Sequence, residues 1–171
     1  IERHNFDLDG PTIPGGTKRA VDCGDLPWSE TDFASNRATI REAISTIISR
    51  GVVPILVGGD DSIPIPMLAA MGETGKKYTI LQVDAHIDWR EEHMGESMGL
   101  SSTMRRASEM RHIEKIIQVG ARGIGSGHTS DFQDAMAWGV KFFTGSDVHR
   151  KGLQPALEPV SYTHLTLPTK R

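Results

Sequence analysis

Short apolar runs alternate with longer amphipathic stretches along the chain, and the two kinds of segment predict different secondary structure. Four runs of four to six residues are apolar at most positions, which is typical of strands buried on both faces of a parallel sheet. The predicted strands span residues 52–57, 78–83, 116–119 and 140–143. Each run ends at glycine, aspartate or a Thr-Gly pair, and these residue types favour turns.

The intervals between the runs have helical periodicity. Residues 32–50 place Phe33, Ile40 and Ile44 on one face, and Gly51 follows as a stop signal. The other predicted helices span residues 62–71, 101–112 and 130–138. The alternation of helices with buried strands predicts an α/β layered fold with right-handed crossovers.

Composition narrows the classes of partner. The chain has 19 Lys and Arg against 22 Asp and Glu, and it has no basic cluster larger than a pair such as Arg105-Arg106. This is too little positive charge for a phosphate-neutralising surface, so we expect no nucleic-acid partner. The single cysteine, Cys23, cannot form an internal disulfide, and no run of about 18 apolar residues suggests a membrane span. These features favour a cytoplasmic protein without a membrane partner.

The two ends of the sequence suggest a partial protein. The chain begins at Ile1, and residues 159–171 shift abruptly to threonine, leucine and proline. This tail resembles the translated adapter read-through that ends some reading frames assembled from environmental DNA; the alternative is an edge strand over Tyr162–Leu167. We therefore expect a partial domain over residues 1–158 and a non-native tail over residues 159–171.

The candidate chemistry follows two neighbouring predicted strands, because ligands of open α/β sheets bind beyond the carboxyl ends of the strands. The first strand leads into Gly58-Gly59-Asp60-Asp61-Ser62, and the second leads into alternating Asp84, His86 and Asp88. In an extended backbone the last three side chains project to one face, where a divalent cation would compensate their charge. Carboxylate and imidazole ligands suit Mn²⁺, with Ni²⁺ and Zn²⁺ as alternatives.

Structural roles are the alternatives for the same residues. Asp84 could cap a turn, His86 could be a core histidine, and Asp88 could pair with Arg90. Asp61 could cap the helix that follows it, since aspartate is a preferred helix cap.

Taken together, the two segments resemble the ureohydrolase superfamily, the arginase and agmatinase enzymes, whose usual motifs are Gly-Gly-Asp-His-Ser and Asp-Ala-His-x-Asp. Here the corresponding stretches read Gly-Gly-Asp-Asp-Ser and Asp84-Ala85-His86-Ile87-Asp88. The resemblance extends from about residue 20 to residue 157 and is greater to agmatinase-like members than to arginases.

The resemblance implies an arginase-like three-layer α/β/α fold with a mostly parallel sheet, here incomplete. It implies a binuclear manganese hydrolase in which a metal-bridging hydroxide attacks a linear, agmatine-like guanidino compound and releases urea and an amine such as putrescine. Asp84 would bridge two Mn²⁺ ions, Asp88 would bind one of them and His86 the other. The family also implies a homo-oligomer, a trimer or hexamer, acting in polyamine metabolism.

Three departures from the family pattern shape the expectation for this chain. Asp61 stands where the family has a histidine ligand, so it is a fourth candidate ligand. Leu100 stands where agmatinases carry a proton-shuttling histidine, for which nearby His93 could substitute. No Asp-x-Asp pair follows Phe143, so we expect the isolated chain to bind Mn²⁺ weakly and to turn over little.

Other functions remain open at this point. Guanidinobutyrate and related guanidino acids are alternative substrates, and a non-catalytic binding or assembly subunit is the alternative function. The glycine-rich stretch over residues 120–127 invites a nucleotide-binding interpretation, but its glycines do not match the G-x-G-x-x-G spacing.

Overall fold

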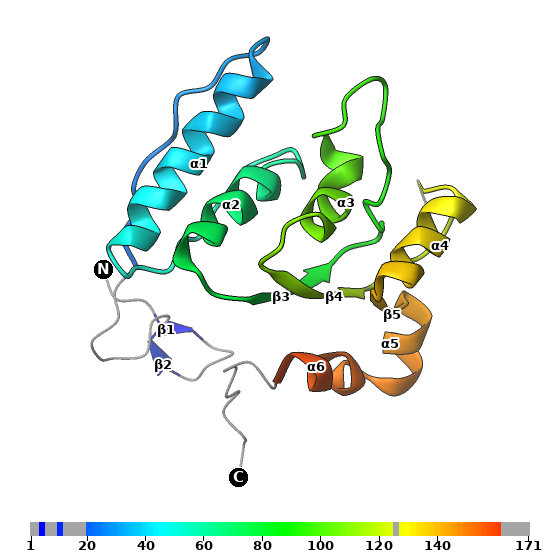
Figure 1. Ribbon diagram of the computed structural model, residues 1–171. Coiled ribbons are helices and arrows are strands. Elements are labelled where there is room, and N and C mark those ends of the chain that lie inside the picture. Colours follow the sequence, from blue (N-terminus) through cyan, green and yellow to red (C-terminus); the bar gives the residue numbers. More distant parts are fainter. Residues whose placement is uncertain (1–3, 6–9, 12–19, 125–126, 162–171) are drawn as a thin grey trace.

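The computed structural model describes residues 4–5, 10–11, 20–124 and 127–161 of the chain. At its centre lies a parallel sheet with the strand order β3-β4-β5 (Figure 1). These strands are β3 (Tyr78–Val83), β4 (Ile113–Val119) and β5 (Lys141–Phe143). A separate antiparallel pair joins β1 (His4–Asn5) and β2 (Gly10–Pro11).

Helices connect and follow the strands of the sheet. The α-helices are α1 (Phe33–Ser49), α2 (Pro64–Met71), α3 (Thr103–Ser108), α4 (Thr129–Trp138), α5 (Gly145–Lys151) and α6 (Gln154–Ser161). Two 3₁₀ turns, η1 (Gly72–Thr74) and η2 (Leu100–Ser102), follow α2 and precede α3. Among the described residues, no helix combines the length and the apolar character that a membrane crossing needs.

The core has two parts, one on each face of the sheet. On one face, Ile116 of β4 packs with Met104 and Ala107 of α3 and with Ala135 of α4. On the other face, residues of β4 pack with Ala156 and Val160 of α6 and with part of α5. Figure 1 shows α2, α3 and α4 on one side of the sheet and α6 on the other. The expected three-layer α/β/α arrangement with a parallel sheet is therefore confirmed.

Alternation along β4 explains how one strand serves both parts of the core. Successive side chains of a strand point to opposite faces, so Ile116 enters the first cluster and Ile117 the second. Both are buried, because β4 is the central strand and pairs with β3 and with β5. A run that is apolar at most positions and buried on both faces is the pattern on which the strand prediction rested.

Local signals fix several helix ends close to the predicted positions. The side chain of Asp32 accepts a hydrogen bond from Ser35 N at 2.9 Å and caps α1. At the end of α4, Gly139 adopts φ +108°, a left-handed conformation that glycine takes without steric cost. The predictions for these two helices and for the strand over residues 78–83 are confirmed within one or two residues.

The prediction of a strand over residues 52–57 is wrong. These residues form no strand pairing among the described parts of the chain, and Val53, Ile55 and Val57 are largely exposed. An apolar run forms a strand only where a neighbouring backbone supplies hydrogen bonds and a helix covers it. No strand pairs with this segment in the described structure, and only Pro54 and Leu56 of the run are partly buried.

The predicted helix over residues 101–112 is shorter than expected, because its first turn is η2 and α3 ends at Ser108. The sequence interpretation missed α5 and α6. Helix α6 continues into residues 159–161, while the rest of the tail, with the alternative edge strand, lies outside the described residues.

Candidate metal centre

Three carboxylates meet at the carboxyl end of β3. One oxygen from each of Asp61, Asp84 and Asp88 lies within 4.8 Å of the others. Asp84 directly follows β3, Asp88 lies four residues further along, and Asp61 comes from the turn that precedes α2. Residues from two separate segments are thus brought together, as the sequence interpretation expected.

Asp84 is placed by the ends of two paired strands. Its N–H donates to the carbonyl of Val119 at 2.9 Å, and its carboxylate accepts the N–H of His86 at 2.8 Å. Gly120 follows β4 with φ +101°, and a Cβ there would lie 3.0 Å from the carbonyl oxygen of Asp84. A glycine is therefore required at residue 120 for the two strand ends to approach one another.

The turn before α2 leaves the Asp61 side chain available for the cluster. The side chain that stabilises this turn is that of Asp60 rather than Asp61, because the Asp60 carboxylate accepts a hydrogen bond from Ser62 N at 3.0 Å. The N-cap residue of α2 makes no side-chain capping bond, so the interpretation of Asp61 as a helix cap is wrong. The hydroxyl of Thr103, at the start of α3, donates to the carbonyl of Asp61 and ties the turn to the core.

Asp88 is the buried member of the cluster. Its residue is only 5% exposed, and its backbone adopts φ +47°, a left-handed conformation that aspartate tolerates better than most residues. Its carbonyl accepts the N–H groups of Met104 and Arg105 at 3.0 and 3.2 Å, which holds it against α3. Trp89 then enters the core.

Burial and mutual repulsion disturb the titration of this cluster. Burial, together with the charges of Asp61 and Asp84, raises the pKa of Asp88 to about 7. Burial also raises the pKa of Asp61, and the charges of Asp84 and Asp60 act in the same direction. Without a counter-charge, the cluster retains protons that isolated carboxyl groups would lose near pH 4.

A divalent cation fits this set of donors. Carboxylate oxygens are the ligands that Mg²⁺ and Mn²⁺ prefer, and a cation would compensate the charge that otherwise disfavours three adjacent carboxylates. No lysine or arginine side chain is recorded in an ion pair with any of the three among the described residues.

Asp88 has an amide partner that the sequence interpretation missed. Nε2 of Gln82 donates to Oδ2 of Asp88 at 2.6 Å, whereas an ion pair between Asp88 and Arg90 was the alternative considered. Gln82 in turn contacts Gln118 of β4. The sequence did contain a signal for this contact, since the apolar runs over residues 78–83 and 116–119 both end in a Gln-Val pair. An amide inside an apolar run needs a buried hydrogen-bond partner.

His86 lies beside the cluster rather than within it. Its Nδ1 is 3.4 Å from Oδ1 of Asp84, and its side chain is 54% exposed. The interpretation as a core histidine is therefore wrong. Among the described residues His86 does not join the three carboxylates within 4.8 Å, and its role as ligand of a second ion stays a prediction.

His93 lies on the exposed loop after Trp89. It forms an antiparallel bridge with Glu96, with both N···O distances at 3.0 Å. Its Nδ1 is 2.8 Å from Nη1 of Arg90; since a guanidinium only donates, Nδ1 is the acceptor. This placement gives His93 a structural partner, and its proposed proton-shuttling role stays a prediction.

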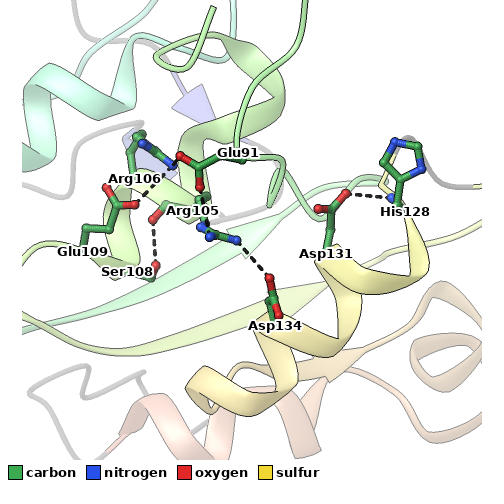
Figure 2. Close-up of polar contacts among 8 residues, drawn as sticks. All are labelled: Glu91, Arg105, Arg106, Ser108, Glu109, His128, Asp131 and Asp134. Carbon is green, nitrogen blue, oxygen red and sulfur yellow. Dashed lines mark hydrogen bonds and ion pairs between the residues drawn. The ribbon is translucent and has the colours of Figure 1, made fainter.

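Ion pairs fasten the same loop to the helices beside it. Figure 2 shows Glu91 between Arg105 and Arg106 of α3, and Arg105 also reaches Asp134 of α4. The two guanidinium groups, Arg106 foremost, lower the pKa of Glu91. Glu91 thus joins this loop to both arginines of α3.

The fold and the cluster define an α/β protein with an acidic, metal-compatible site at the carboxyl end of its sheet. The model of the Arginase family matches residues 3–166. The chain therefore belongs to the arginase family, as the motif resemblance indicated.

Individual relatives carry several activities in their names. The chain is 27% identical over 158 residues to a guanidinobutyrase of Pseudomonas aeruginosa, covering 91% of this chain and 49% of the relative. It is 31% identical over 125 residues to a mitochondrial agmatinase of Gallus gallus, covering 72% of this chain and 36% of the relative. The chain thus spans about half the length of these relatives or less.

Solved structures agree on the fold. Formimidoylglutamase from Bacillus subtilis superposes with a TM-score of 0.79 at 24% identity, covering 92% of this chain and 49% of the other. Agmatine ureohydrolase of Thermoplasma volcanium gives a TM-score of 0.69 at 28% identity, covering 82% and 46%. The incomplete, arginase-like fold expected from the sequence is therefore confirmed.

Proposed function

We propose that the protein hydrolyses a linear guanidino compound to urea and an amine with the help of divalent cations, Mn²⁺ first among them. The observation that carries this proposal is the convergence of Asp61, Asp84 and Asp88 at one end of the sheet. Membership of the arginase family supports it, as do the guanidinobutyrase and agmatinase names of the relatives.

The chain's own residues have separable tasks in this reaction. Asp84, half-buried between the strand ends, would be a ligand of both cations. Asp88 would be a ligand of one cation and His86, from the exposed side, of the other, with Asp61 as a further ligand. When bound, the cations supply Lewis acidity, which lowers the pKa of water and stabilises developing negative charge. Water then adds to the guanidinium carbon and gives up a proton, the bond between that carbon and the alkyl-bearing nitrogen breaks, and the departing amine takes up a proton, which leaves urea.

The distal end of the substrate decides between agmatine and guanidino acids. An agmatine-like amine is our proposal, on the closer motif resemblance to agmatinases and the 31% identity to one of them. The guanidinobutyrase and formimidoylglutamase relatives make a guanidino or formimidoyl acid the competing class. We further propose that the intact protein is a cytoplasmic trimer or hexamer.

Urea release tests the proposal. We would purify the 171-residue chain and the product of the whole source reading frame, load each with Mn²⁺, and offer agmatine, 4-guanidinobutyrate and formimidoylglutamate separately. Urea is measured for the first two compounds and formamide for the third, because hydrolysis of a formimidoyl group releases formamide. We expect urea from agmatine with the whole reading frame and little from the chain alone. Release from 4-guanidinobutyrate only would move the substrate class to guanidino acids.

Metal content distinguishes the enzyme from the alternative function. About two ions per polypeptide in the whole reading-frame product support the binuclear hydrolase. No bound metal and no turnover on any of the three compounds would contradict it and favour a non-catalytic binding or assembly subunit.

A further inference from the structure

Two glutamines lie side by side across the sheet, beneath the acidic cluster. Gln82 of β3 and Gln118 of β4 are register partners, and Gln118 is only 2% exposed. Burying an amide among apolar strands costs free energy unless the amide is hydrogen-bonded. The partners of these two amides therefore indicate why they occupy these positions.

The hydrogen bonds of the pair run in one direction. Nε2 of Gln118 donates to the carbonyl of Ile87 at 2.8 Å and also to Oε1 of Gln82. Nε2 of Gln82 then donates to Oδ2 of Asp88 at 2.6 Å. Each bond joins a nitrogen that can only donate to an oxygen that accepts.

The two ends of this chain of bonds determine its direction. The carbonyl of Ile87 can only accept, so the nitrogen end of the Gln118 amide must face it. The same nitrogen also donates to Oε1 of Gln82. Because the oxygen of the Gln82 amide therefore faces Gln118, its nitrogen faces Asp88. The reverse orientation would bring carbonyl oxygens against the Ile87 carbonyl and the Asp88 carboxylate. Oε1 of Gln118 has no partner in the described structure, so the orientation of this amide is set by its nitrogen.

We propose that Gln118 and Gln82 are positioning residues that orient the Asp88 carboxylate for a divalent cation. Gln82 holds one oxygen of Asp88, so the carboxylate cannot rotate freely and its other oxygen keeps a fixed direction. Gln118 acts through Gln82 and also anchors the backbone immediately before Asp88. This inference rests on the proposed metal-binding role of Asp88.

The first experiment measures Mn²⁺ binding by the 171-residue chain, using the electron paramagnetic resonance signal of free Mn²⁺. The variants are Gln82→Met, Gln118→Met and the double variant, with the exposed Gln133→Met on α4 as control. Each of the first two should weaken binding about 10- to 100-fold, the usual effect of removing a partner of a ligand. Because both act on Asp88, the double variant should lose less than the product of the single losses.

Thermal unfolding without metal separates positioning from general damage. A structural role alone would lower Mn²⁺ affinity only in proportion to the loss of folded protein, and the two losses would multiply in the double variant. The proposal requires weaker binding at temperatures where each variant is fully folded. Unchanged affinity in both single variants, or fully multiplicative losses, would overturn it.

A second measurement needs no metal and so stands apart from the proposed function. Hydrogen exchange of the side-chain amide protons, followed by nuclear magnetic resonance, should show Gln82 and Gln118 protected in the unmodified chain. In Gln118→Met the protection of Gln82 should fall, while Gln133→Met should leave it unchanged. If the unmodified chain binds no Mn²⁺, the metal role of Asp88 fails, whereas an unprotected Gln82 contradicts the positioning itself.

Discussion

Two apolar runs in this chain resemble each other in sequence and lie in opposite environments. The run over residues 116–119 belongs to β4, the central strand, where Ile116 is 0% exposed. Residues 52–57 form no strand, and Ile55 is 82% exposed. The difference lies in their neighbours: β4 pairs with two strands and is covered by helices on both faces. An apolar run therefore shows the capacity for burial, while its partners decide whether burial occurs.

The candidate metal centre joins these two regions. Asp61 follows the exposed run, whereas Asp84 and Asp88 follow β3, which pairs with β4. One side of the site is thus supported by the core, and the other depends on the bond between Thr103 and the Asp61 carbonyl. We expect the two sides to respond differently to substitution.

The largest expected effect comes from trimming one isoleucine in each run. Ile116→Ala removes packing at the centre of the sheet and should lower the free energy of unfolding by about 2–5 kcal/mol. Ile55→Ala, at an exposed position, should change it by no more than about 0.5 kcal/mol. Urea unfolding of the two variants measures both values. An equal loss in Ile55→Ala would show that residues 52–57 are buried in solution.

Removing the buried carboxylate should separate stability from metal binding. In the metal-free chain, Asp88→Asn relieves repulsion with Asp61 and Asp84 and keeps an acceptor for Gln82, so the melting temperature should rise by about 2–4 °C. Mn²⁺ affinity should fall at least about tenfold, because an anionic ligand is lost. Glu42→Gln, at an exposed position on α1, is the control. A lower melting temperature in Asp88→Asn would argue against repulsion in the cluster.

The link between the two regions can be tested at Thr103. Thr103→Val keeps the shape of the side chain and removes the hydroxyl that donates to the Asp61 carbonyl, which should cost about 1 kcal/mol of stability. It should also weaken Mn²⁺ binding, because Asp61 is then held less firmly against Asp84 and Asp88. Thr46→Val, at an exposed position in the middle of α1, should leave Mn²⁺ binding unchanged.

The elements that the sequence predicted correctly have both a regular apolar pattern and a neighbouring element to pack against. The helical spacing of Ile40, Ile44 and Ile47 predicted α1, and the apolar run over residues 78–83 predicted β3 with its bounds. The run over residues 52–57 carries the same kind of pattern, and nothing in its own residues reports whether another backbone lies beside it. Pairing between distant segments is therefore the information that the pattern lacks.

The acidic residues of the candidate site could be predicted from the sequence, whereas the hydrogen bonds that hold them could not. The sequence placed Asp61, Asp84 and Asp88 at one edge of an expected sheet, because each polar segment follows an apolar run. Only Asp84 and Asp88 follow a strand in the structure, whereas the run before Asp61 forms none. The bond from Gln82 to Asp88 depends on the register of β3 against β4 and on the left-handed turn at Asp88. Both are properties of the folded backbone, which spacing along the sequence does not report.

The smallest expected effect concerns α5, which has a capping box at its N-terminus. The hydroxyl of Thr144 accepts a hydrogen bond from Asp147 N at 3.1 Å, and the Asp147 carboxylate accepts one from Thr144 N at 3.1 Å. Unlike the run over residues 52–57, this segment therefore carries hydrogen bonds of its own that stabilise its local structure. The hydrogen bonds from Thr144, with Arg150 nearby, lower the pKa of Asp147.

A lowered carboxyl pKa stabilises the folded state at neutral pH, and this contribution is lost as the pH falls below about 4. Asp147→Asn should therefore destabilise the chain slightly at pH 7, and the difference from the unmodified chain should be smaller at pH 3. Thermal unfolding at the two pH values measures it. A difference of the same size at both values would mean that the capping box holds α5 through its hydrogen bonds without a contribution from the carboxylate charge.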